Sequence, residues 1–159
     1  MSRDKKLSLQ SQERAPQDRR SQRNTKVFKD GETDLKTLMA TMQPVLMEGR
    51  YVFCSVSQAA YERLEIKPLG TFQEQEGITI IITEEQAKMT GLPYDSTWAC
   101  ITLRVHSSLS AVGFLAALAG QLAQAAISVN AVSAFYHDHL FVPWESRETA
   151  MKILEEQAG

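Results

Sequence analysis

The stretch that decides the fold is Trp98-Ala99-Cys100-Ile101-Thr102-Leu103-Arg104-Val105, together with the residues that follow it. Its composition predicts a strand whose side chains alternate between an inward and an outward face. A polar turn follows at His106–Ser110, and the small residues of Ala111–Ala126 predict a helix packed closely on a sheet. Ser108 or Ser110 is the natural N-cap of that helix, because a hydroxyl can accept the unpaired N–H groups of a first turn.

A hairpin and a final helix come next. Ser128–Ala134 predicts a strand, Tyr136–Asp138 the bend that reverses it, and His139–Pro143 the returning strand. Ser146 is expected to cap a last amphipathic helix, whose inward positions are Ala150, Ile153 and Leu154. The order from Trp98 onward is therefore β-α-β-β-α, which is the order of a ferredoxin-like unit.

The residues before Trp98 predict an α-β-β-α order. The first helix begins at a Thr33 or Asp34 cap and ends at Pro44, and its apolar stripe is Leu35, Leu38, Met39 and Met42. The clearest strands are Tyr51–Val56 and Ile78–Thr83, and the near-continuous β-branching of the second suggests burial on both faces. Weaker patterns predict a short helix within 57–67, a strand within 68–75 and a short helix from Thr83 or Glu84 to about Met89.

These patterns predict an α+β fold made of tandem ferredoxin-like βαββαβ units, with antiparallel sheets and helices on one face. The expected division is a disordered basic tail over residues 1–32, a first unit over 33–96 and a second unit over 97–159. The first unit lacks a convincing opening strand and the second lacks a closing one. Either Trp98–Val105 is shared between the units, or strands are exchanged between the halves or between subunits.

Charge is unevenly distributed along the 159 residues, although the formal net charge is only −2. Residues 1–32 hold nine Lys or Arg and five Asp or Glu, whereas the rest holds eight and 14. This balance predicts neither a nucleic-acid partner nor a membrane partner, and no apolar run is long enough for a membrane span. Cys54 and Cys100 lie in apolar runs, which favours buried free thiols and a cytoplasmic location.

Four segments resemble those of small bacterial tandem ACT-domain proteins: Glu32–Leu35, Tyr51–Cys54, His106–Leu109 and Tyr136–Pro143. The resemblance covers about residues 32–157, and it extends more distantly to the cytosolic arginine sensor and to the regulatory domains of aspartate kinases. It implies a regulatory module that senses an amino acid through the pairing of its ACT units. It also implies a homodimer, and it implies a separate protein partner because no catalytic domain is attached.

The resemblance further implies that the ligand lies against the turn and helix start after Trp98–Val105. The corresponding positions are His106, Ser107, Ser108, Leu109, Ala111, Val112 and Gly113, and the hairpin adds Phe135 and Asp138. Physical chemistry favours the same place: a helix N-terminus attracts a carboxylate, Gly113 allows a close approach, and Asp138 can face an ammonium group. The ligand is thus expected to be an amino acid or a similar small carboxylate. The alternative is that His106–Ser110 only caps the helix.

Other functions have weaker support. His137 and His139 project to one face of a strand and Asp138 to the other, so a metal site would need His106 from a distant segment. No nucleophile elbow, P-loop or dinucleotide fingerprint is present, and we therefore expect neither an enzyme nor a cofactor. The remaining alternative is a scaffolding dimer without ligand. Trp98 is expected in the core, and Trp144 either in the core or at a subunit interface.

Overall fold

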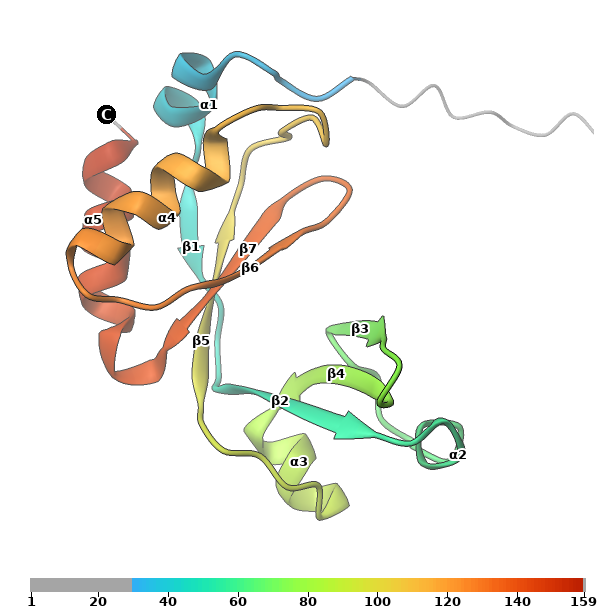
Figure 1. The fold of residues 1–159 in the computed structure, drawn as a ribbon. Helices are drawn as coiled ribbons and strands as arrows, with labels where there is room; N and C mark the ends of the chain where they lie inside the picture. The colour runs from blue at the N-terminus through green and yellow to red at the C-terminus, as the bar shows by residue number, and fades with distance from the viewer. Residues whose placement is uncertain (1–29, 159) are drawn as a thin grey trace, which may run out of the picture.

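The computed structural model describes residues 30–158, and the prediction for residues 1–29 lies outside them. One antiparallel sheet runs through the described part of the chain in the order β3-β4-β2-β5-β7-β6, and β1 also pairs with β5 (Figure 1). The strands are β1 Pro44–Leu46, β2 Tyr51–Val56, β3 Gly70–Gln73, β4 Ile78–Thr83, β5 Trp98–Leu103, β6 Asn130–Ser133 and β7 Asp138–Pro143. The helices are α1 Leu35–Thr41, α2 Gln58–Tyr61, α3 Glu84–Thr90, α4 Phe114–Gln124 and α5 Arg147–Gln157, with a 3₁₀ turn η1 at Trp144–Ser146.

The second half of the chain obtains its closing strand from the segment that precedes the first half. β1 pairs antiparallel with β5, so that Pro44 lies opposite Leu103 and Leu46 opposite Ile101. Leu38 of α1 and Met42 are fully or almost fully buried in the same core cluster as α4 and α5. Within one chain, a strand from the segment before β2 thus completes the second half, and β5 also meets β2 of the first half at one residue pair. The division at residues 33–96 and 97–159 stays a prediction.

The first half is built around β2, which serves as its opening strand. Its core combines Val52 and Cys54 of β2 with Ile80 and Ile82 of β4 and with Ala87 of α3. β2 meets β5 at a single residue pair, Tyr51 opposite Trp98. The two halves therefore share one sheet, but β2 and β5, the strands at which they meet, are paired at one residue pair.

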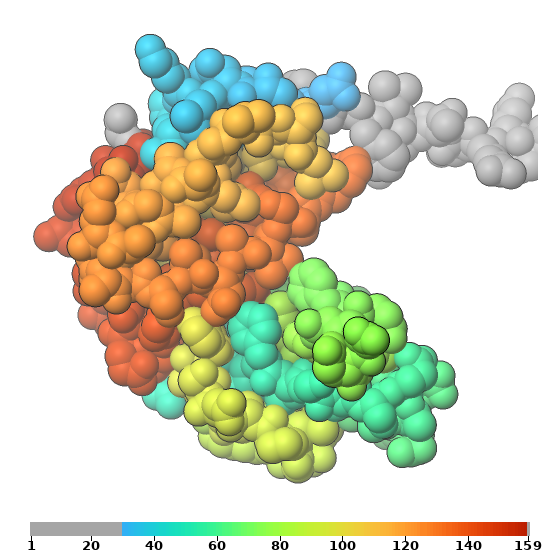
Figure 2. Space-filling view, viewed as in Figure 1, coloured from blue at the N-terminus to red at the C-terminus, as the bar shows by residue number. Residues whose placement is uncertain are grey.

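β5 is buried on both faces, and the predicted alternation of an inward and an outward face is wrong. Ala99, Ile101 and Leu103 pack in the cluster that contains α4 and α5. Cys100 lies on the opposite face, in a second cluster with Tyr51, Ile81 and Phe141. This second cluster draws on β2, β4, β5 and β7, so it connects the two halves. Figure 2 shows that the surface is hollowed between the two halves. Both faces of β5 are thus covered because the sheet curls around it.

Local capping explains where several helices begin. Asp34 caps α1 as predicted, since its Oδ2 accepts the N–H of Thr37 at 2.8 Å. Thr83 and Gln86 form a reciprocal capping box at α3. Ser146 does not cap α5 through its side chain, which corrects the prediction. It is the last residue of the turn η1 and has helical backbone angles itself, whereas a capping residue needs an extended backbone.

Two features of the tryptophans and cysteines bear on the packing. Trp144 packs against the core cluster of the second half and lies beside two guanidinium groups, with Arg147 Cζ at 4.3 Å and Arg50 Cζ at 4.9 Å from the ring centroid. Cys54 and Cys100 are buried free thiols, as predicted, and burial raises the pKa of Cys100 to about 11. In the described part of the chain, no helix has the length and apolar character needed to cross a membrane.

Candidate functional site

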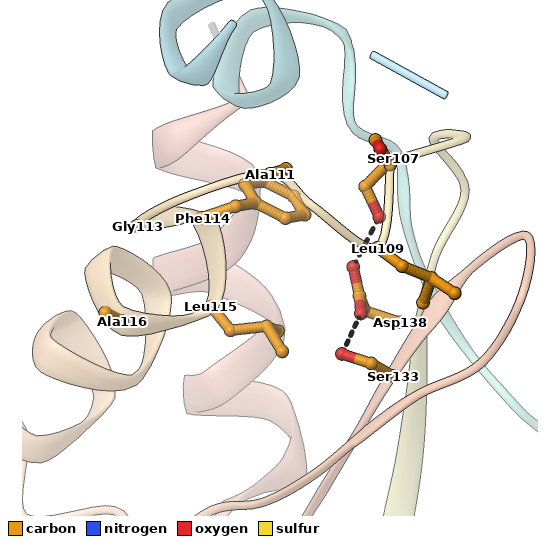
Figure 3. Close-up of a pocket in the computed structure, with 10 residues that line it drawn as sticks. Ser107, Leu109, Ala111, Gly113, Phe114, Leu115, Ala116, Ser133 and Asp138 are labelled. Carbon is orange, nitrogen blue, oxygen red and sulfur yellow. Dashed lines mark hydrogen bonds between the residues drawn. The ribbon is translucent and has the colours of Figure 1, made fainter. Parts of the chain in front are cut away.

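A pocket of about 120 Å³ lies between the loop after β5, the start of α4 and the β6–β7 hairpin (Figure 3). The loop supplies two hydroxyls and small or apolar side chains, and the hairpin supplies a hydroxyl and a carboxylate. The lining residues are Ser107, Ser108, Leu109, Ala111, Gly113, Phe114, Leu115, Ala116, Ser133 and Asp138. The pocket is therefore polar on the hairpin side and mostly apolar on the helix side.

Asp138 is the charged group of this pocket, and it is only 4% exposed. Its Oδ2 accepts a hydrogen bond from Ser107 Oγ at 2.8 Å, and its Oδ1 accepts one from Ser133 Oγ at 2.7 Å. Within residues 30–158, the ion pairs involve other carboxylates. Each carboxylate oxygen thus accepts one serine hydroxyl, and each retains capacity for a further donor.

The N-terminus of α4 forms the facing wall. The helix begins at Phe114, three residues later than predicted, and its N-cap is Gly113 in the left-handed region with φ of +88°. No described side chain caps it. Ser108 and Ser110, the predicted caps, bond to each other instead, with 2.8 Å between their Oγ atoms. The first N–H groups of a helix have no partner within the helix, so these remain available at the pocket.

The predicted ligand residues do not all meet at this pocket. Ser107, Ser108, Leu109, Ala111, Gly113 and Asp138 line the pocket. His106 and Phe135 lie on the other side of the loop, where a second hollow is lined by Asp30, Gly31, His106, Ser107, Ser108, Leu109 and Phe135. The ring of His106 lies 5.2 Å from that of Tyr136 and 6.5 Å from that of Phe135. Val112 is 84% exposed and lines neither hollow.

Sequence reasoning missed four lining residues for two different reasons. Phe114, Leu115 and Ala116 were missed because the helix start was placed too early. Ser133 was missed although the hairpin pattern contained the signal. It pairs with Asp138 across β6 and β7, and opposite residues of an antiparallel pair lie close together. A register count back from the bend would have found it.

The histidines beside Asp138 have separate structural partners. His137 Nδ1 lies 3.2 Å from the carbonyl oxygen of Val105, and His139 Nδ1 lies 2.9 Å from Thr102 Oγ1. Burial lowers the pKa of His139, and the nearby His137 lowers it further, whereas Asp138 raises it. In the part of the chain that the structure describes, no group of three or more metal-binding side chains gathers.

The structure thus consists of two α+β units that share one sheet, with a pocket between the strand β5, the helix α4 and the β6–β7 hairpin. Residues 30–99 match the ACT domain, and residues 95–156 match it a second time. The chain therefore belongs to the ACT-domain family and carries two ACT domains in tandem. This confirms the resemblance and the fold class drawn from the sequence. ACT domains are regulatory ligand-binding modules.

Solved structures give the same result. A Vibrio cholerae protein of unknown function, described as a possible transport protein, is 42% identical, and the match has a TM-score of 0.71 and covers 79% of this chain and 96% of that one. An Agrobacterium tumefaciens protein is 16% identical, with a TM-score of 0.59, and the match covers 74% of this chain and 90% of that one. The regulatory subunit of aspartate kinase from Thermus thermophilus is 12% identical, with a TM-score of 0.57, and the match covers 74% of this chain and 97% of that one. The last two likenesses show the fold alone. No protein of curated function matches the chain.

Proposed function

We propose that this chain is a sensor of a small amino acid, which binds in the pocket between α4 and the β6–β7 hairpin. One observation carries the proposal: the uncapped N-terminus of α4 and the buried carboxylate of Asp138 line the same pocket. An α-amino acid has a carboxylate and an ammonium group on one carbon atom. The helix end suits the first and Asp138 suits the second.

The size of the pocket limits the ligand. A volume of about 120 Å³ is well below the roughly 300 Å³ at which pockets for drug-sized ligands begin. The side-chain end of the ligand would meet Leu109, Phe114 and Leu115. We therefore expect an amino acid with a short side chain to bind better than a long cationic one.

Binding would act through the pairing of ACT units. In this proposal the chain forms a homodimer in the cytoplasm, has no catalytic role and transmits ligand occupancy to a separate protein partner. ACT-domain membership supports the regulatory part. The loop that lines the pocket carries Leu109 and Val112, and the hairpin carries Phe135 and Tyr136, all of them at least half exposed or nearly so. A ligand that shifts this loop would change the apolar surface presented to a second chain.

A thermal-shift screen of the full-length protein against the twenty amino acids tests the proposal. A ligand that binds only the native state stabilises it by about 2.7 kcal/mol at a concentration of one hundred times its Kd. We expect a clear rise in melting temperature with at least one small amino acid, and little change with arginine or lysine. No shift with any of the twenty at millimolar concentration would exclude amino-acid sensing and would leave a ligand-free scaffolding dimer.

Asp138→Asn tests the site itself. Asparagine keeps an oxygen acceptor for one of the two serine hydroxyls, but it removes the negative charge that an ammonium group would require. We expect the ligand-induced shift to disappear, while the unliganded protein still unfolds cooperatively. Glu74→Gln, which also removes a charge but lies outside the pocket, is the matched control and should keep the full shift.

A further inference from the structure

The first three described residues, Asp30–Glu32, form an N-terminal strap on the outside of the loop that lines the pocket. Glu32 pairs in parallel with Ser107. Its N–H donates to the carbonyl of His106 at 2.8 Å, and its carbonyl accepts the N–H of Ser108 at 2.8 Å. The strap therefore holds the backbone on both sides of Ser107, which is the residue that donates to Asp138.

Gly31 is required for this contact because the strap lies directly against the loop. A Cβ atom at Gly31 would lie 2.4 Å from the backbone nitrogen of Ser108 and 2.7 Å from the carbonyl oxygen of Ser107. Side-chain carbons do not approach backbone atoms so closely, and backbone atoms cannot rotate away as a flexible side chain could. Any larger residue at position 31 would separate the strap from the loop.

The loop is a partition between two hollows. Ser107, Ser108 and Leu109 line the candidate ligand pocket on one side and the hollow that includes Asp30 and Gly31 on the other. The far end of the same loop is also close to α1, since a Cβ at Gly113 would lie 3.7 Å from Leu35 Cδ2. Asp138 therefore holds the loop on the pocket side, and the strap and α1 contact it on the opposite side.

We propose that the strap is the positioning element of the pocket, and that Gly31 and Glu32 are its positioning residues. With the strap in place, Ser107 and Ser108 are fixed where the pocket needs them; without it, the loop moves away from Asp138. Because linkage is reciprocal, a ligand that fixes the loop also stabilises the docked strap by the same factor. This second part rests on the proposed function, whereas the first part does not.

Hydrogen exchange without any ligand tests the first part. In Gly31→Ala, we expect the Ser108 amide and its neighbours in 106–113 to exchange roughly tenfold faster or more, because overpacking at backbone contacts displaces the strap. Amides of α3, in the other half, should exchange at the wild-type rate. Gly120→Ala is the matched control, because a Cβ there meets nothing within 4 Å, and it should leave the exchange of 106–113 unchanged.

Unchanged exchange at 106–113 in Gly31→Ala would overturn the proposal, and so would equal acceleration throughout the protein. If this variant does not fold, native-state exchange of the wild type decides. The amides of Glu32 and Ser108 should then open with the same free energy and the same denaturant dependence, and clearly different values would refute a strap and loop that move together.

A ligand arm tests the coupling. The probe is the amino acid that gives the largest thermal shift in the screen. Its apparent affinity should fall roughly tenfold in Gly31→Ala and stay constant in Gly120→Ala, and it should slow exchange of the Glu32 amide in the wild type. Affinity that is independent of Gly31 would refute the coupling. A screen without any hit would refute the proposed function. Hydrogen exchange without ligand would still test whether the strap positions the loop.

Discussion

Asp138 and His139 are neighbours on β7 that face opposite sides of the sheet. Asp138 is tied to two serines at the pocket, and His139 is tied to Thr102 on β5. Their environments differ accordingly: the carboxylate is surrounded by hydroxyl donors, and the imidazole is in a partly buried place where a positive charge is disfavoured. The alternation of side chains along the strand thus places a carboxylate at the pocket and an imidazole with a lowered pKa on the other face.

His139 is expected to make stability depend on pH. Its pKa in the folded protein is lowered from the ordinary value of 6.5, first by burial and then by His137. The unfolded state therefore binds more protons below about pH 6.5, and the free energy of unfolding decreases as the pH falls from there towards the lowered pKa. Urea unfolding between about pH 8 and pH 5 measures this decrease.

His139→Asn is the matching variant, because an amide can replace Nδ1 opposite Thr102 but does not titrate. Its stability should decline less steeply over the same range than that of the wild type. Parallel declines in the two proteins would assign the pH dependence to other groups.

At the scale of the element, α4 has one glycine at its N-cap and one inside the helix, and the two have opposite roles. Gly113 is its N-cap with φ of +88°, whereas a Cβ at Gly120, inside the helix, would meet nothing within 4 Å. Gly113→Ala should destabilise the protein by about 1–2 kcal/mol, because a left-handed backbone disfavours a Cβ. Gly120→Ala should instead stabilise it by up to about 1 kcal/mol. Urea unfolding of both variants checks the signs, and shifts in the same direction would contradict this assignment.

The elements also show what a sequence can and cannot specify. The β-branched run Ile78–Thr83 and the capped stripe that begins after Asp34 were predicted correctly, because each pattern is local. Pro44–Leu46 was not predicted as a strand, since three residues carry no periodicity and gain their structure only from β5. The start of α4 was misplaced because its cap is a glycine rather than a serine.

In the candidate site, too, local features were predicted from the sequence and contacts with distant residues were not. The sequence placed the turn after β5 opposite Asp138, and the structure joins them through Ser107. The sequence did not place Gly31 at the back of that turn, because nothing local to residue 31 indicates a contact with Ser107 and Ser108, which lie far along the chain. Contacts of that separation depend on the complete tertiary fold.

At the scale of the whole molecule, the exchange of β1 predicts how the chain can be divided. Residues 97–158 alone lack β1 and α1, and so lack Leu38 and Met42 of their own core. We expect this fragment to be unfolded. A permuted chain with 97–158 first, a flexible Gly/Ser linker and then 30–47 should fold cooperatively, since it restores α1 and β1 to this core. Circular dichroism with thermal unfolding distinguishes the two, and a fragment 97–158 that folds alone would contradict this prediction.

The same exchange of β1 has a consequence for the order of synthesis. The ribosome adds roughly 5–20 residues per second and delivers the chain from its N-terminus. The strands β2, β3 and β4 can pair as soon as they emerge, because they are consecutive. β1 emerges before them but has no partner until β5 has left the exit tunnel. β1, the first of the described strands to be synthesised, must therefore stay unpaired for several seconds, and the beginning of the described chain is among the last parts to reach its final contacts.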